Sequence, residues 1–207
     1  MKYRIIPTLI AKNQKELYYL FNRYKKHTKH FQIDVMDGKF VKNKSNWFNF
    51  KLTKGYNYEA HLMTDDPERW VYKNYKKIDA VIANFERVKN PIRLIKFANA
   101  KKKKIMFAIN PETSINKLKP YLKHLDGVLI LAVHPGRYGA KFLFKTLEKI
   151  RILRKVYNGN IEVDGHQDPK NIKLCKNAGA NLFAVGSYLK NAAEIKIAMR
   201  ELKKSLR

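Results

Sequence analysis

The sequence predicts a (β/α)8 barrel of the TIM type, a single α/β domain over residues 1–207. Three observations predict it: eight short apolar or β-branched runs, amphipathic stretches between them, and a length near the lower limit of this fold. No linker-like segment or change of composition divides the chain. An open, doubly wound sheet is the alternative, but such sheets favour a glycine-rich turn after the first strand. Here the first run ends in Pro7-Thr8.

The predicted elements alternate in chain order. The strands are expected at residues 3–8, 31–35, 58–62, 80–83, 105–109, 127–133, 160–163 and 182–185. Apolar residues spaced near 3.6 predict helices between the strands and after the last one, most clearly around residues 17–24, 144–153 and 195–202. Strand and helix therefore alternate along the whole chain.

Composition excludes several classes of protein. A hydrophobic fraction of 45% supports a packed core, so the high charge does not indicate disorder. The single cysteine, Cys175, excludes a disulfide scaffold and a cysteine-rich zinc module. No apolar run approaches the roughly 18 to 20 residues of a membrane span, and the first residues do not resemble a signal peptide. We therefore expect a cytoplasmic protein with no membrane partner.

The charge balance allows two interpretations. Lys and Arg number 44 against 17 Asp and Glu, a net charge of +27 that attracts polyanions. Lysine alone supplies 34 of these cations, and an excess of Lys, Asn, Ile, Tyr and Phe is also what an A/T-rich genome produces. The lysine clusters at 25–29, 76–77, 101–104 and 154–155 precede predicted strands, which places them on the barrel end opposite a site at the strand ends. We expect nucleic-acid binding to be weak and non-specific at most.

Polar side chains gather where predicted strands end, which is where barrels carry their sites. Alternation along a strand places the following residues on inward faces: Gln32, Asp34 and Met36; His61 and Met63; Asp164. Taken singly, such an aspartate is a cap or turn residue, and such a histidine or methionine belongs to a core. Together they put two carboxylates, Asp34 and Asp164, across one barrel mouth with His61 beside them.

The motifs carry a resemblance to a known family. The strings are DVMDGKF at 34–40, HLM at 61–63, NP at 110–111, VLILAVHPGRYG at 128–139, EVDG at 162–165 and NAGANLFAVGS at 177–187. In this order they resemble the ribulose-phosphate 3-epimerase family, of which the chain looks like a divergent member. The resemblance implies a barrel of the ribulose-phosphate-binding type. It also implies a divalent cation (Zn, Fe, Mn or Co) held by two histidines and two aspartates, with the aspartates as acid and base.

Carried over by position, the resemblance assigns Asp34, His61 and Asp164 as metal ligands, and Asp34 and Asp164 as the catalytic pair. The implied substrate-binding residues are Thr8, Met36, Met63, Gly136, Gly139, Gly165, Gly186 and Ser187. Among these, the backbone N–H groups of Gly165, Gly186 and Ser187 are expected to hold a phosphate.

The chain departs from the family pattern at several positions. Gln32 stands where the family has its first metal histidine, and an amide oxygen is a weaker ligand for a zinc-like ion, although it suits hard cations. His166 replaces the second glycine of a DGG motif, where it would crowd the loop or add a ligand or a cation. The other departures are Thr8 for serine, Leu131 for methionine, Arg137 in the loop after residue 133, and a short stretch between Asp34 and His61 with Trp47–Phe50 in place of a helix start.

Inverting a carbon beside a ketone requires two bases on opposite sides of a flat intermediate, which matches two facing aspartates. The intermediate is an enediolate, whose negative oxygens a metal stabilises. Together with the resemblance, which implies the pathway and the substrate, this chemistry leads us to expect an isomerase of the pentose phosphate pathway. It would epimerise C3 of a ketose phosphate, D-ribulose 5-phosphate to D-xylulose 5-phosphate or a close relative, as a homo-oligomer. The alternative is an inactive or repurposed barrel that serves as a polyanion-binding or scaffold protein.

Overall fold

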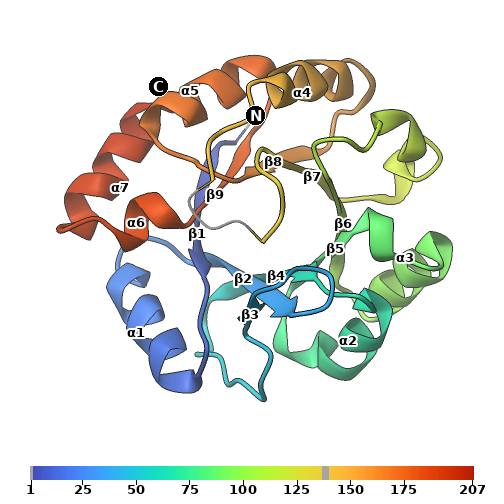
Figure 1. Cartoon of the computed structure of the whole chain (residues 1–207), viewed down its shortest axis with the longest axis horizontal. Coiled ribbons are helices and arrows are strands. Elements are labelled where there is room, and N and C mark those ends of the chain that lie inside the picture. The colour runs from blue at the N-terminus through green and yellow to red at the C-terminus, as the bar shows by residue number, and fades with distance from the viewer. Residues whose placement is uncertain (1, 137–139) are drawn as a thin grey trace.

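Eight parallel strands close into a barrel in the computed structural model, which describes residues 2–136 and 140–207 (Figure 1). Each predicted strand is present: β1 (Arg4–Leu9), β2 (His30–Asp37), β4 (Asn57–Met63), β5 (Ala80–Asn84), β6 (Lys104–Ile109), β7 (Gly127–Leu131), β8 (Asn160–Asp164) and β9 (Leu182–Val185). The pairing order is β1-β9-β8-β7-β6-β5-β4-β2, and β1 pairs with β2 to close the ring. The predicted TIM-type barrel is confirmed.

The seam between β1 and β2 is short, and an added strand lies beside it. Only Thr8 with Gln32 and Leu9 with Ile33 pair across this seam. A two-residue strand, β3 (Lys44–Ser45), runs antiparallel to the end of β2. β3 was not predicted, because two residues are too few for an alternation signal.

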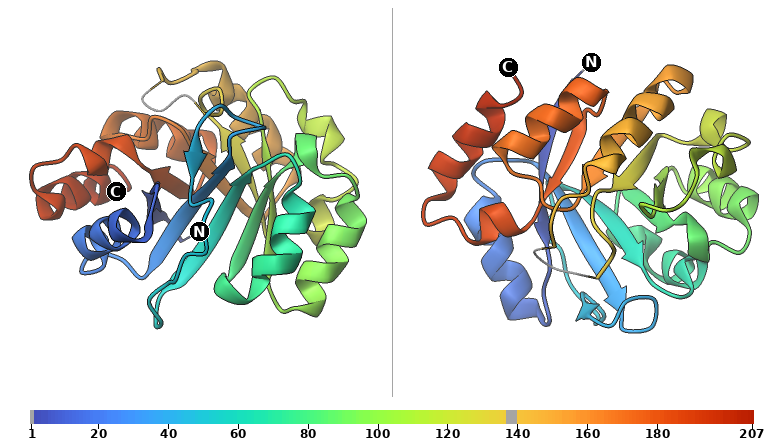
Figure 2. Two further views of the ribbon diagram at one scale, coloured as in Figure 1. Left: turned by 60° about the horizontal axis from the view of Figure 1, so that its bottom comes forward. Right: turned by 45° about the horizontal axis from the view of Figure 1, so that its top comes forward.

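Helices cover the outside of the barrel, as both views in Figure 2 show. They are α1 (Gln14–Tyr24), α2 (Pro67–Asn74), α3 (Pro91–Ala100), α4 (Lys145–Val156), α5 (Pro169–Ala178), α6 (Ser187–Lys190) and α7 (Ile195–Lys204). The side chains of Asn13, Asp66, Asn90 and Asp168 accept N–H groups at the starts of α1, α2, α3 and α5. Such caps satisfy backbone donors that a helix start otherwise leaves unpaired.

Two connections contain no α-helix, and the structure describes both completely. Between β6 and β7 the chain forms two single 3₁₀ turns, Ile115–Lys117 and Leu122–His124. Between β2 and β4 it forms β3 and an irregular segment, in agreement with the short stretch noted around Trp47. Further 3₁₀ turns, Tyr75–Lys77 and Phe85–Arg87, precede and follow β5. The barrel is therefore less regular around β2 and β6 than elsewhere.

The inside of the barrel has an apolar side and a polar side. Ile82, Met106 and Leu129 form an apolar cluster with Ala108 and Leu131 on β5, β6 and β7. On β2, β4 and β8 the completely buried inward residues are polar: Gln32, His61 and Glu162. The strands that carry the predicted site are thus also the strands with a polar interior. Among the described residues, none of the helices combines the length and the apolar composition that a membrane-spanning helix needs.

Candidate active site

The predicted trio of Asp34, His61 and Asp164 comes together at the barrel mouth. Asp34 and His61 are paired in register on neighbouring strands, and β8 brings Asp164 from across the barrel. Nδ1 of His61 lies 3.6 Å from Oδ1 of Asp34 and 3.2 Å from Oδ2 of Asp164. His61 is completely buried, and Asp34 is 4% exposed. An imidazole thus lies between two carboxylates, largely out of water.

Gln32 joins this group from β2, two residues before Asp34 and therefore on the same inward face. Its Nε2 donates to Oδ1 of Asp34 at 2.7 Å and to Oδ2 of Asp164 at 3.0 Å. Because carboxylate oxygens only accept hydrogen bonds here, the amide nitrogen must face them and Oε1 must face away. Gln32 is therefore a hydrogen-bonded bridge between the two aspartates in this structure, and not an oxygen ligand beside them.

Burial and mutual contact set the protonation of the group. Burial raises the pKa of Asp34, because a charged carboxylate loses hydration there. Burial also opposes charge on His61, but its contacts with Asp164 and Asp34 outweigh this and raise the pKa of His61 to about 10. A positive imidazole is therefore favoured between the two carboxylates when nothing else balances their charge.

A second pair of acids lies below the first, toward the far end of the barrel. Glu59 and Glu162 are each two residues before a member of the trio and so share its inward face. Burial raises the pKa of Glu162 well above its ordinary value and that of Glu59 to about 7. The pair therefore holds a proton that exposed glutamates would lose. Sequence reasoning assigned these residues no role, although their spacing from His61 and Asp164 was the available signal.

The donor set fits a divalent cation. One ligand atom from each of Asp34, His61 and Asp164 lies within 4.8 Å of the others, and no further cluster of this kind occurs among the described residues. Nε2 of His61 and Oε1 of Gln32 are buried without a hydrogen-bond partner in the described structure, and Nδ1 of His61 makes only the two ion-pair contacts with Asp34 and Asp164. Two carboxylates and an imidazole suit zinc, iron, manganese or cobalt. Gln32 adds an oxygen ligand only if its amide group rotates by about half a turn, which exchanges the positions of Nε2 and Oε1.

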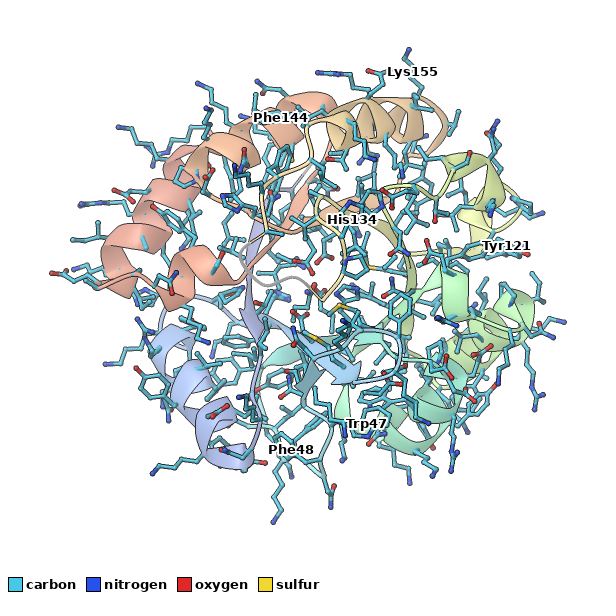
Figure 3. All side chains as sticks on the ribbon, viewed as in Figure 1. Trp47, Phe48, Tyr121, His134, Phe144 and Lys155 are labelled. Atoms are coloured by element: carbon cyan, nitrogen blue, oxygen red, sulfur yellow. The ribbon has the colours of Figure 1, made fainter. Side chains whose placement is uncertain are left out.

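A cavity of about 1180 Å³ opens above the trio. It is lined by Asp34, Asp164 and all the predicted substrate-binding residues that the structure describes: Thr8, Met36, Met63, Gly136, Gly165, Gly186 and Ser187. Gly139 and Arg137 lie outside the described residues. Trp47 and Phe48 extend the wall at the bottom of the view in Figure 3, where Phe48 lies toward α1 and Trp47 toward α2. The residues expected to bind a substrate therefore surround one space.

The turn after β8 contains Gly165 and His166. It requires glycine at position 165, and it accommodates the histidine that replaces the second glycine of the family motif. Gly165 has a φ of 108°, and a Cβ there would lie 2.6 Å from Cγ2 of Val133. His166 follows with a φ of 50°, and its Nδ1 lies 2.9 Å from the carbonyl oxygen of Ala140. His166 lines the cavity but is not part of the metal-compatible trio.

The second acid of the DVMDG string has a structural role. A carboxylate oxygen of Asp37 accepts the backbone N–H groups of Lys39 at 2.8 Å and Phe40 at 3.1 Å, and its other oxygen accepts that of Asp65 at 2.8 Å. Desolvation opposes the charge, but these backbone donors outweigh it and hold the pKa of Asp37 below its ordinary value. Asp37 thus shapes the loop beside the site.

The lysine clusters lie at the opposite end of the barrel, as predicted. Lys101 caps the end of α3 and Lys104 begins β6, and Lys155 projects at the outer edge of the ring (Figure 3). Two acids at this end are engaged with the backbone: Asp79 accepts the N–H of Tyr58, and Asp126 accepts that of Ile105. The far end therefore presents mainly cations to solvent.

Comparisons with known proteins agree with this geometry. The model of the ribulose-phosphate 3 epimerase family matches residues 4–190. The ribulose-phosphate 3-epimerase of Aquifex aeolicus is 31% identical over 191 residues, covering 82% of this chain and 81% of the relative. That of Chlamydia muridarum is 32% identical over 170 residues, covering 75% and 74%.

The solved structures add evidence on the fold alone. A mutant tryptophan synthase alpha-subunit from Pyrococcus furiosus superposes with a TM-score of 0.73 at 14% identity, covering 100% of this chain and 99% of the other. The family match over nearly the whole chain is the more specific finding, and it agrees with the converged trio. The chain belongs to the ribulose-phosphate 3-epimerase family of isomerases.

Proposed function

We propose that this protein epimerises C3 of a ketose phosphate, D-ribulose 5-phosphate to D-xylulose 5-phosphate or a close relative. The observation that carries the proposal is the pair of carboxylates, Asp34 and Asp164, brought together from β2 and β8 beneath one cavity. Relatives named ribulose-phosphate 3-epimerase support the choice of substrate. Membership of an isomerase family supports the class of reaction.

The two aspartates act as acid and base. One removes the proton from C3, and the other returns a proton to the opposite face of the flat enediolate, which inverts the configuration. Burial raises the pKa of Asp34, so its carboxylate is a stronger base than an exposed one. The Gln32 amide holds one oxygen of each carboxylate and thereby keeps the two groups in a fixed relation.

Asp34, His61 and Asp164 would hold a divalent cation, which when bound supplies positive charge that stabilises the enediolate oxygens. Met36, Met63 and Leu131 give the cavity an apolar wall beside the carboxylates. We assign the phosphate of the substrate to backbone N–H groups of Gly165, Gly186 and Ser187, which line the same cavity.

The alternative function, a polyanion-binding or scaffold role, is favoured by one observation: the net charge of +27 with its lysine clusters at the far end. Electrostatic attraction alone supports dissociation constants of roughly 10⁻⁴ to 10⁻⁶ M for nucleic acids at physiological salt. We keep weak, non-specific binding as our expectation, together with a cytoplasmic location and a homo-oligomeric state.

A panel of ketose phosphates tests the proposed function. Purified protein is assayed for exchange and inversion at C3 after metal analysis, both as isolated and with added Zn²⁺, Mn²⁺, Fe²⁺ or Co²⁺. We expect epimerisation of at least one ketose 5-phosphate. Absence of C3 inversion for every substrate and metal would contradict the proposal and favour the non-enzymatic alternative.

A further inference from the structure

Asn46 has an unusual environment immediately after β3. It is 1% exposed and has a φ of 48°, in the left-handed region that asparagine tolerates better than most residues. Its backbone N–H donates to Ala11 at 2.7 Å. Its Nδ2 donates to the carbonyl oxygens of Leu9 at 2.7 Å and Asp34 at 2.9 Å. One side chain thus connects the ends of β1 and β2 at the short seam of the barrel.

These partners determine which end of the amide faces which way. Backbone carbonyls only accept hydrogen bonds, so the NH₂ group must be the end that contacts Leu9 and Asp34. The other end, Oδ1, is buried and has no hydrogen-bond partner among the described residues. Asn46 is one of the residues that line the cavity above the trio. A buried acceptor left unpaired costs free energy, so this oxygen calls for a donor. It has almost no accessible surface, so a donor in the cavity reaches it only when the neighbouring side chains shift.

Thr8 presents a second such atom to the same cavity. It is 5% exposed, and its Oγ1 is buried without a partner in the described structure. A hydroxyl can donate and accept, whereas the amide oxygen of Asn46 only accepts. The ligand chemistry that satisfies both atoms is a chain of neighbouring hydroxyl groups, which offer donors and acceptors together.

We propose that Asn46 is a substrate-binding residue whose Oδ1 accepts a hydrogen bond from a hydroxyl of the ketose, beside Thr8, which the family resemblance already assigns to the substrate. This inference rests on the proposed function, because it takes a polyhydroxyl substrate to occupy the cavity. It assigns to the β2–β4 connection a role in selecting hydroxylated substrates. The side chain of Asn46 also donates a hydrogen bond to the backbone carbonyl of Asp34. One side chain would therefore both contact the substrate and position the catalytic base.

The test combines a variant with deoxy substrates. Asn46→Gly keeps the left-handed backbone accessible and removes the amide. Wild-type and variant proteins are assayed with the parent ketose 5-phosphate and its 1-deoxy and 4-deoxy analogues, which keep the C3 proton and the ketone. Since a buried acceptor left unpaired is costly, the wild type should lose at least about fivefold in kcat/KM with one analogue. In the variant this loss should shrink to about twofold or less.

The ratio of kcat/KM for the parent substrate to kcat/KM for each deoxy analogue distinguishes substrate contact from a structural role. A structural role would lower kcat/KM equally for the parent and both analogues. Asn84→Ala is the matched control, because Asn84 is also buried with an unpartnered Oδ1 but does not line the cavity. Its parent-to-deoxy ratios should equal those of the wild type. Equal ratios in wild type and Asn46→Gly would overturn the assignment of Asn46, whereas no turnover of the parent by the wild type would instead overturn the proposed function.

A crystal structure of the wild-type protein with the corresponding pentitol 5-phosphate tests the contact of Asn46 directly. This test remains available if the Asn46→Gly variant does not fold. We expect a ligand hydroxyl within about 3.2 Å of Oδ1 of Asn46. A bound pentitol phosphate that leaves this oxygen in contact with water alone would overturn the inference.

Discussion

The mouth and the far end of this barrel both concentrate ionisable side chains, but they arrange them in opposite ways. At the mouth, Asp34, His61 and Asp164 contact one another and are mostly buried. At the far end, charged groups contact aromatic rings or backbone: Lys29 lies 4.4 Å from the ring centroid of Tyr56. Charges interact strongly where water is excluded and weakly where it is not. Changes at the mouth should therefore have large, mutually dependent effects, and changes at the far end small ones.

Removing either carboxylate of the mouth should have the largest effect. Asp34→Asn and Asp164→Asn each delete one of two proton-transfer groups, so each should lower kcat for epimerisation by at least about a hundredfold. Steady-state kinetics with a ketose 5-phosphate measure this. Asp126→Asn, at the far end, is the control and should keep wild-type turnover. Near-normal kcat in either mouth variant would mean that the two-base mechanism is wrong.

The next largest effect is expected on metal affinity, from a substitution of Gln32, whose amide bridges the two carboxylates. Gln32→His replaces the amide with an imidazole, a better ligand for zinc-like ions, and should tighten metal binding about tenfold, within the range reported for groups around a metal site. Calorimetric titration of metal-free wild-type and variant proteins measures it. Equal affinities would indicate that position 32 does not reach the metal.

A smaller effect is expected from a histidine at the far end. Burial lowers the pKa of His30, and the nearby cations Arg4, Lys104 and Lys2 lower it further. Since the folded state binds this proton less well than the unfolded state, His30 should reduce stability as pH falls below about 6.5. His30→Gln should therefore raise the melting temperature more at about pH 5.5 than at about pH 7.5. An identical gain at both values would contradict this account.

The smallest catalytic effect should follow the largest change of charge. Replacing Lys101, Lys102, Lys103 and Lys104 with Glu alters the far end only, so kcat/KM should change by less than about twofold. Filter binding to several RNA sequences at two salt concentrations should give weak affinities that fall with salt and fall again in the variant. Tight, sequence-selective binding would show that the far end is more than a solvated surface, and loss of catalysis would show that it is coupled to the mouth.

Several features of the site were beyond sequence reasoning for identifiable reasons. Glu162, which is completely buried, and Glu59, which is partly buried, follow the same alternation as Asp164 and His61. Because glutamates are usually exposed, the pattern alone did not indicate this burial. β3 was too short to give a periodic signal, and Asn46 was not distinguishable from an ordinary loop asparagine. The 3₁₀ turns between β6 and β7 replaced a helix that the alternating pattern had led us to expect.

The sequence by itself determined the eight strands and their order along the chain. On β2, β4 and β8 it also determined which residues near the site face inward, because alternation is a property of neighbouring residues. It also determined that Asp34, His61 and Asp164 lie at strand ends. Only the tertiary structure decided that the Gln32 amide reaches Asp164, a contact across 132 residues, and that Oδ1 of Asn46 is left unpaired at the cavity wall. These contacts depend on how the barrel closes between β1 and β2, because closure sets the distances between side chains that no local pattern relates.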